Sequence, residues 1–214
     1  MFIKSLFFHI TSILFPETCV VCKKEGISLC DSCLQTLTPA PFLKDLWMHS
    51  LFSYQDKNVR NIIHALKFKH TQSVVHSIAP LMYDVLEDIE GQNLYLNNEK
   101  LILLPVPRMR THMHARGFDA VLHLSKALLK YNSGYKTDTA SVARINTKAQ
   151  VGLSRSERLT NMKNAFKVIN SASLYHQRIC IIDDVITTGS TLRELRKVCL
   201  EAGAKEVFAI TIAH

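Results

Sequence analysis

The sequence of 214 residues has no internal repeat, no low-complexity run and no small-residue cleavage site before Cys19. Its first fifteen residues, MFIKSLFFHITSILF, are apolar but too short to span a bilayer comfortably. Without a cleavable secretory signal, an oxidising compartment is not expected for the cysteines. We therefore expect a globular cytoplasmic protein. Its N-terminal segment either packs on the rest of the chain as a short helix or lies at the inner face of the cytoplasmic membrane.

Acidic residues are in the minority, with 18 Asp and Glu against 26 Lys and Arg, which gives a formal net charge of +8. If four cysteines bind one Zn²⁺ as thiolates, that site contributes −2 and the net charge falls to about +6. A positive charge of this size favours polyanionic partners, such as nucleotides, nucleic acid or an anionic membrane surface.

One segment carries the strongest functional signal, residues 179–191, with the sequence ICIIDDVITTGST. Its first four residues have the length and β-branching of a buried strand. Two carboxylates, Asp183 and Asp184, follow, and a turn rich in hydroxyl groups then leads into an amphipathic helix that begins near Thr191. Backbone N–H groups at a helix N-terminus bind anions such as phosphate, and Gly189 lets the backbone curl around such a group.

The acidic pair Asp183–Asp184 would repel a phosphate but accept hydrogen bonds from vicinal hydroxyl groups, as acidic residues do on a ribose. A loop that binds a phosphate and a diol together indicates a ribose 5-phosphate. The predicted phosphate loop comprises Val185, Ile186, Thr187, Thr188, Gly189, Ser190 and Thr191. The plainer interpretation is a strand–turn–helix corner whose acids only cap the helix, although two carboxylates after a buried strand are costly without a partner.

Two C-x-x-C pairs lie near the N-terminus, formed by Cys19, Cys22, Cys30 and Cys33. Four thiolates at this spacing predict a closed, tetrahedral, structural Zn²⁺ site, and a module this short would hardly fold without its metal. Two disulfides or a redox dithiol are the alternatives. The remaining cysteines, Cys180 and Cys199, fall in an apolar strand and a helix, so we predict buried core thiols there.

Strands and helices alternate along the rest of the chain, which predicts an α/β fold with a parallel sheet flanked by helices. Helices are expected at residues 59–68, 72–88, 118–129, 155–165 and 192–202, and strands at 51–54, 101–106, near 141, 179–182 and 207–212. Gly203 is expected to close the last helix. The predicted domains are an N-terminal apolar segment and zinc-binding module (1–37), a linker (38–50) and the α/β domain (51–214).

Residues 179–191 resemble the phosphoribosyl pyrophosphate (PRPP) binding signature of type I phosphoribosyltransferases. Together with the cysteine pairs, the motifs Leu104–Pro107 and Arg116-Gly117-Phe118 make the chain similar to the ComF family of phosphoribosyltransferase-like competence proteins. Polar and apolar positions with the family's spacing continue the similarity at Arg144, Thr147, Gln150, Leu153, Arg158, Asn161, Ala165 and Phe166. The resemblance implies a type I phosphoribosyltransferase-like fold and a role in taking up single-stranded DNA during natural transformation.

The chain departs from the family pattern after Phe118. The family usually continues with Asn-Gln, whereas this sequence has Asp119 and Ala120. Asp119 keeps a helix-capping oxygen, but it lacks the amide donor and adds a negative charge.

Two groups of basic residues could contact phosphate. Arg108, Arg110 and Arg116 follow the strand at 101–106, so they should face the same crevice as Asp183 and bind a pyrophosphate or a DNA backbone. The second group, Lys57, Arg60, Lys67 and Lys69, lies near Tyr54 and could bind single-stranded nucleic acid by stacking and phosphate contacts. The plainer interpretation of the arginine group is a solvated loop.

Two functions remain open from the sequence. The first is a competence protein that binds PRPP or ribose 5-phosphate and handles single-stranded DNA, with DNA-uptake machinery at the inner membrane as a partner. The second is an active, Mg²⁺-dependent phosphoribosyltransferase that transfers phosphoribose from PRPP to a base or amine. In that case the catalytic residues Asp183 and Asp184 would hold the ribose hydroxyls, and Mg²⁺ would bridge these and the pyrophosphate. The sequence reveals no acceptor site and no general base.

Overall fold

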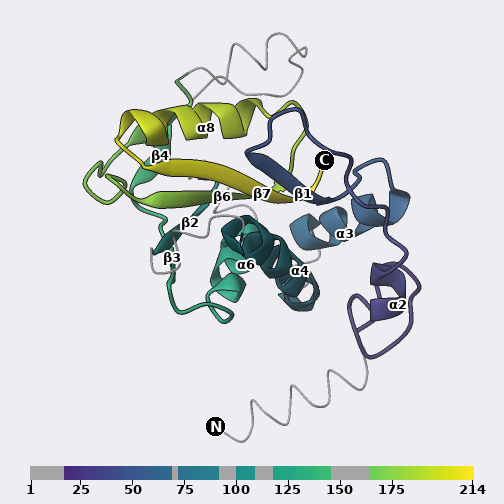
Figure 1. Cartoon of the computed structure of the whole chain (residues 1–214). Coiled ribbons are helices and arrows are strands. Elements are labelled where there is room, and N and C mark those ends of the chain that lie inside the picture. The colour runs from purple at the N-terminus through teal and green to yellow at the C-terminus, as the bar shows by residue number, and fades with distance from the viewer. Residues whose placement is uncertain (1–16, 69–71, 92–99, 109–117, 146–163) are drawn as a thin grey trace, which may run out of the picture.

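A five-stranded parallel sheet forms the centre of the molecule (Figure 1). The computed structural model describes residues 17–68, 72–91, 100–108, 118–145 and 164–214. In the order β1–β7–β6–β2–β3, the strands are Met48–Phe52, Glu206–Ala213, Arg178–Val185, Leu101–Pro105 and Tyr135–Thr137. Each strand runs parallel to its neighbours, as expected where strands alternate with helices.

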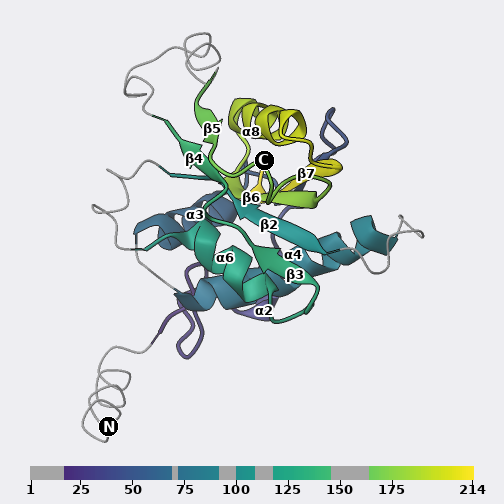
Figure 2. The same ribbon diagram turned by 90° about the vertical axis from the view of Figure 1, so that its left-hand side faces the viewer.

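Helices cover both faces of the sheet (Figure 1 and Figure 2). On one face lie α3 (Lys57–Phe68), α4 (Gln72–Gly91) and α6 (Ala120–Leu128), and on the other lies α8 (Ser190–Glu201). Successive strand residues point to opposite faces, so Ile182 packs in the core under α3, α4 and α6, and Ile181 packs in the core under α8. The predicted fold class, a parallel sheet flanked by helices, is confirmed.

Four of the predicted helices are found, each with ends within a few residues of the prediction. Gly203 has a φ of 88° directly after the C-cap of α8, and it closes that helix as predicted. The first strand lies at Met48–Phe52, slightly earlier than expected. The three-residue strands β3 and β5 (Phe166–Val168) were not predicted.

A small antiparallel pair, β4 (Val142–Arg144) and β5, lies beside α8 (Figure 2). The strand expected near residue 141 is β4. Most of the helix predicted at 155–165 lies outside the described residues. Its last two positions are not helical, because Asn164 has a φ of 61° and Ala165 leads directly into β5.

The strand order reverses between β2 and β6, and in open α/β sheets this switch point is where a crevice forms. These strands are neighbours in the sheet, yet the chain leaves β2 toward α6 on one face and leaves β6 toward α8 on the opposite face. Connections that diverge in this way open a space beyond the carboxyl ends of the two strands, where ligands bind in open α/β sheets. Arg108 follows β2 at this end, and Asp183 and Asp184 lie near the end of β6.

The N-terminal cysteine module, which contains the short helix α2 (Asp31–Leu34), packs directly on α4. Leu29 is fully buried in the same core as Val74 of α4, and Ser28 Oγ lies 2.5 Å from Ser73 Oγ. The segment after the module is also held, since Ala40 N donates to Leu51 O at 3.0 Å. The division into domains at residues 37 and 50 stays a prediction.

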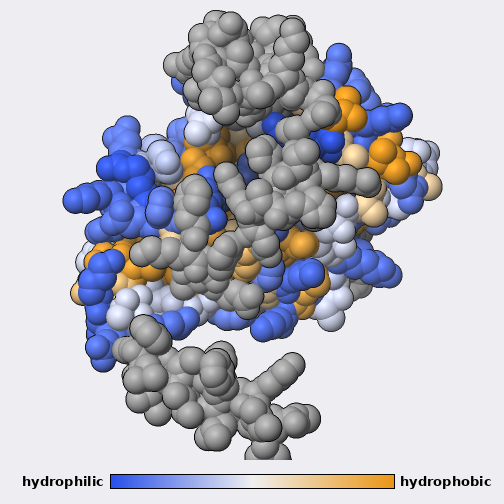
Figure 3. Space-filling model, turned by 180° about the vertical axis from the view of Figure 1, so that it is seen from behind, coloured by the Kyte–Doolittle hydropathy of each residue, from blue (hydrophilic) through white to orange (hydrophobic). Residues whose placement is uncertain are grey.

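The described helices are all too short or too polar to cross a membrane. The face seen in Figure 3 is mainly hydrophilic where it is not grey, and its hydrophobic residues form separate patches.

Candidate functional site

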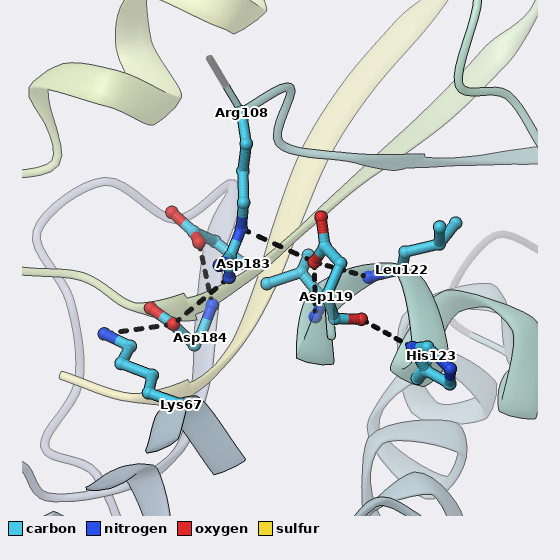
Figure 4. Close-up of polar contacts among 8 residues, drawn as sticks. Lys67, Arg108, Asp119, Leu122, His123, Asp183 and Asp184 are labelled. Atoms are coloured by element: carbon cyan, nitrogen blue, oxygen red, sulfur yellow. Dashed lines mark hydrogen bonds and ion pairs between the residues drawn. The ribbon is translucent and has the colours of Figure 1, made fainter. Parts of the chain in front are cut away.

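Asp183 and Asp184 stand near the carboxyl end of β6, beside the crevice (Figure 4). Because neighbouring residues of a strand point to opposite faces, Asp184 is turned toward α3, where Lys67 lies, and Asp183 toward β4, where Arg144 lies. The backbone N–H of Asp184 donates to Asp183 Oδ1 at 2.8 Å and fixes the first carboxylate against the strand.

Two cations from different elements meet on one oxygen of Asp184. Lys67 Nζ, near the end of α3, lies 3.0 Å from Asp184 Oδ2, and Arg108 Nη2, after β2, lies 3.8 Å from the same atom. The Asp184 side chain is only 11% exposed, so these pairs are less screened than surface ion pairs. The sequence placed Lys67 on a nucleic-acid surface and gave no sign of its contact with the acidic pair.

Asp119 orients Arg108 as well as capping a helix. Its Oδ1 accepts hydrogen bonds from Val121 N at 3.1 Å and Leu122 N at 3.2 Å, which confirms the capping role expected for it at α6. The same oxygen lies 3.4 Å from Arg108 Nε. Arg108 therefore bridges Asp119 and Asp184 across the crevice (Figure 4). The residue that departs from the family pattern thus holds an arginine in place.

The Asp183 carboxyl group of the acidic pair has a strongly raised pKa. Burial, and then the adjacent charge of Asp184, raise the pKa of Asp183 to about 7, against the lowering effects of the Asp184 N–H and of Lys67 and Arg108. Burial also lowers the pKa of Arg144, an effect that the charge of Asp183 partly offsets. Asp183 is therefore poised to gain or lose a proton near neutral pH.

The loop after β6 has the geometry of an anion site. Gly189 has a φ of 72° and occupies the N-cap of α8, where it offers no side chain to the N–H groups of the first turn. The hydroxyl oxygens of Thr188 and Ser190 lie 2.9 Å apart at the same turn, and both side chains are partly exposed. Hydroxyl groups thus converge with the N–H groups of the first turn at the positive end of a twelve-residue helix, where Ser190 N donates to Thr188 Oγ1 at 3.4 Å.

Arg193 supports this loop from behind. Its Nη1 donates to Thr188 O at 2.8 Å, and its Nη2 donates to Asp45 Oδ2 at 2.6 Å. The guanidinium also fills the space beside Gly189, since a Cβ placed there would lie 3.3 Å from Arg193 Nη1. The carbonyl oxygen of Thr188 would repel an anion, but its hydrogen bond to Arg193 ties it to a cationic guanidinium group. The sequence carried no signal that joined Asp45 to this loop.

The other predicted site residues are distributed as follows. Val185 packs against the core under α3, and Ile186 is buried in the core under α8 and donates its N–H to Ala213 O at 2.9 Å, so these two residues anchor the loop. Thr187 is exposed and Thr191 partly exposed. Arg110, Arg116 and Lys69 lie outside the described residues.

Of the predicted nucleic-acid surface, two further residues are described, both exposed on α3. Lys57 stands in the first turn of the helix. Arg60 Nη1 donates to Gln55 O at 2.6 Å and to Tyr54 O at 3.1 Å, so its guanidinium is held at the start of the helix.

The four N-terminal cysteines form one compact cluster. The sulfur atoms of Cys19, Cys22, Cys30 and Cys33 all lie within 4.8 Å of one another, an arrangement that could hold a metal ion. The Sγ atoms of Cys22 and Cys30 are 3.7 Å apart, close to the roughly 3.8 Å edge of a tetrahedron with metal–sulfur bonds of about 2.3 Å. A single cluster of four fits one tetrahedral ion better than two separate disulfides.

The cluster is electrostatically adapted to a cation. Burial opposes ionisation of Cys19, but backbone N–H groups of Cys22, Cys30 and Val21 lower its pKa to about 6. Burial and the neighbouring sulfur atoms raise the pKa of Cys33 to about 12, since the cluster cannot carry four negative charges without compensation. Cys180 and Cys199 are both fully buried in the cores, as predicted.

Comparison with known proteins gives two groups of similar chains, although no profile of a protein family matches. Competence protein F of Haemophilus influenzae is 30% identical over 147 residues, which is 68% of this chain and 63% of the relative. The DNA utilization protein YhgH of Salmonella typhimurium is 30% identical over 148 residues, with the same coverage. The matched segments therefore span somewhat less than two thirds of these relatives.

Solved structures of purine phosphoribosyltransferases resemble the chain more remotely. Hypoxanthine phosphoribosyltransferase from Trypanosoma cruzi has 15% identity and a TM-score of 0.42, over 66% of this chain and 64% of that one. A hypoxanthine-guanine phosphoribosyltransferase from Bacillus anthracis has 12% identity and a TM-score of 0.43, over 64% and 68%. On sequence similarity, the chain is a homologue of competence protein F and the YhgH proteins, a relationship that its motifs predicted.

Proposed function

We propose that the chain binds a phosphoribosyl ligand, PRPP or ribose 5-phosphate, at the carboxyl ends of β2 and β6. The observation that carries this proposal is that a group of hydroxyl acceptors and a candidate phosphate site lie next to each other, at the end of β6 and the start of α8. An acidic pair lies near the end of β6, with Asp184 buried and Asp183 partly buried, and a helix N-terminus with a glycine N-cap and two hydroxyl side chains follows it. A ligand with a diol and a phosphate on one five-membered ring matches both.

The phosphate would bind to the α8 end of the site. The N–H groups of the first turn and the hydroxyl groups of Thr188 and Ser190 donate, and the helix dipole favours the negative charge. Arg193 contributes indirectly, because it keeps the Thr188 carbonyl away from the anion through its bond of 2.8 Å.

The ribose hydroxyl groups would donate to the acidic pair. In the described part of the chain, Asp183 Oδ2 and Asp184 Oδ1 have no hydrogen-bond partner, whereas Asp183 Oδ1 and Asp184 Oδ2 are engaged. One acceptor on each carboxylate is therefore left for the diol. Arg108 and Lys67 lie beside Asp184, where they would neutralise a pyrophosphate on the neighbouring ring carbon.

The alternative, catalysis of phosphoribosyl transfer, is supported by one observation. A carboxylate whose pKa is raised to about 7 is a candidate general base at neutral pH, and Asp183 has this property. The sequence alone offered no such candidate. In that reaction the acceptor nitrogen would attack the anomeric carbon while the bond from this carbon to pyrophosphate breaks and pyrophosphate leaves, and Asp183 would take the proton that the acceptor loses.

Calorimetry with ribose 5-phosphate and PRPP tests the binding site. Asp184→Ala removes diol contacts, and Thr188→Val removes a phosphate contact while preserving shape. Each is expected to cost roughly 1.5–3 kcal/mol, about a tenfold to hundredfold loss of affinity. Glu201→Ala is the control, since Glu201 lies at the far end of α8 and pairs with Lys197 on the surface. Unchanged affinity in both site variants means that the loop is only structural.

We further propose that single-stranded DNA binds across the basic residues near the crevice. The formal charge of +8, Lys57 and Arg60 exposed on α3, and Arg108 at the crevice support this. The name of the YhgH relatives refers to DNA utilization, which agrees with it. A partner in the DNA-uptake machinery remains a prediction from the family resemblance, and a cytoplasmic location remains a prediction from the sequence.

The salt dependence of DNA binding tests this second proposal. Log affinity is expected to fall linearly with log salt, and replacing Arg108, Arg110 and Arg116 with Ala should flatten the slope by roughly 2, at about 0.7 for each phosphate that is no longer neutralised. An unchanged slope with abolished PRPP binding assigns the three arginines to the pyrophosphate alone. Absence of any single-strand binding at low salt contradicts direct DNA handling.

A further inference from the structure

The carboxylates of the crevice are already matched by cations of the protein itself. Among the described residues, Lys67 and Arg108 form ion pairs with Asp184, Arg108 also forms one with Asp119, and the charges of Asp183 and Arg144 interact electrostatically. The contact on Asp184 is the closest of these ion pairs, with Lys67 Nζ 3.0 Å from Oδ2. Both partners are largely withdrawn from solvent, with side chains 29% and 11% exposed.

A Mg²⁺ ion bound by the protein does not fit this arrangement. Mg²⁺ keeps several of its waters, and the ligands that the protein supplies here would be one or two carboxylate oxygens at about 2.0–2.1 Å. Asp184 Oδ2 is taken by Lys67 and Arg108, and an ion on this carboxylate would lie against two cations of the chain. Asp183 Oδ1 is also taken, by the backbone N–H of Asp184. The acidic pair therefore does not offer Mg²⁺ a site of its own, and a Mg²⁺ ion of the kind predicted from the sequence would have to be held by the ligand's pyrophosphate and hydroxyl groups.

We propose that Lys67 is a built-in counter-cation of the acidic pair, which lets the pair bind ribose hydroxyl groups without a divalent metal ion. This inference rests on the proposed phosphoribose site. Lys67 offsets the repulsion between the carboxylates and an incoming phosphate, and it leaves Asp184 Oδ1 open to a hydroxyl group. Because Lys67 belongs to α3, whose core residues Ile62, Ile63 and Leu66 are buried, its ammonium group is delivered from a fixed helix.

Two measurements on the full-length protein test the role of Lys67. The first is calorimetry of ribose 5-phosphate with EDTA and with Mg²⁺. The wild-type affinity is expected to be the same in both. Lys67→Met should bind at least about tenfold more weakly in EDTA and regain affinity with Mg²⁺. Lys67→Arg should behave as the wild type, and Lys126→Met, an exposed lysine on α6, is the matched control.

The second measurement is the titration of Mn²⁺ by electron paramagnetic resonance without any sugar phosphate. The wild type should show no Mn²⁺ site, whereas Lys67→Met should gain one that disappears again in Lys67→Met/Asp184→Asn. If ribose 5-phosphate binds to no variant, the proposed function fails, and the Mn²⁺ titration still decides the role of Lys67. A wild type that needs Mg²⁺ for ribose 5-phosphate, or that binds Mn²⁺ as Lys67→Met does, overturns the inference, as does a Lys67→Met that gains no Mn²⁺ site.

Discussion

Cys30→Ser is expected to release one Zn²⁺ per chain and to unfold the N-terminal module. We propose Zn²⁺ as the ion because four cysteine sulfurs form a closed tetrahedral set, and in small structural sites of this kind metal binding supplies the folding free energy. The destabilisation should extend into the α/β domain. Leu29, next to Cys30, is fully buried in the core that contains α4, so unfolding of the module would expose that helix.

Metal analysis and thermal unfolding check this result. The purified wild type should contain one Zn²⁺, and a chelator should lower its melting temperature toward that of Cys30→Ser. Cys199→Ala is the matched control, since Cys199 is also buried but lies in α8, outside the cluster. It should keep its Zn²⁺. Wild-type protein that contains no metal but two disulfides under reducing conditions contradicts the proposal.

Asp183→Asn is expected to stabilise the protein at neutral pH by roughly 2 kcal/mol, while weakening ribose 5-phosphate binding. Burial raises the pKa of Asp183 from 3.8 to about 7, so the folded state binds the proton more tightly than the unfolded state does. The free energy of unfolding therefore falls as pH rises from about 4 to about 7. Above about pH 7 the full destabilisation by the ionised carboxylate remains. Asparagine cannot ionise, yet it still accepts the bond from Asp184 N.

Urea denaturation across this pH range gives the measurement. The advantage of Asp183→Asn should be small at pH 4, grow up to about pH 7 and then stay constant. Asp56→Asn is a control for which the opposite change in stability is expected, a loss at neutral pH. Hydrogen bonds from the backbone N–H groups of Thr38 and Asn58 hold the pKa of Asp56 low, against the effect of burial, so its charge stabilises the fold above its unfolded pKa. A stability difference independent of pH for Asp183→Asn would show that its carboxylate is not destabilised by burial.

The sequence by itself determined the local parts of the site. The strand, turn and helix that contain residues 178–201 follow from an apolar run, one glycine and an amphipathic pattern, all of which act within a few residues. The cap of α6 by Asp119 and the four-cysteine cluster are local in the same sense, because their spacing along the chain fixes their geometry. Strands β3, β4 and β5 each have three residues, too few to show periodicity, and of these only β4 was predicted.

Tertiary structure alone decided which charges meet. Lys67 reaches Asp184, Asp119 holds Arg108, and Asp45 holds Arg193 behind the phosphate loop, although no pattern in the sequence links the members of any pair. These contacts depend on how α3, α6 and the segment before β1 pack around one edge of the sheet. Hydrophobic periodicity specifies which face of a helix is buried, but it does not specify which charged residue at the helix end arrives beside a buried carboxylate.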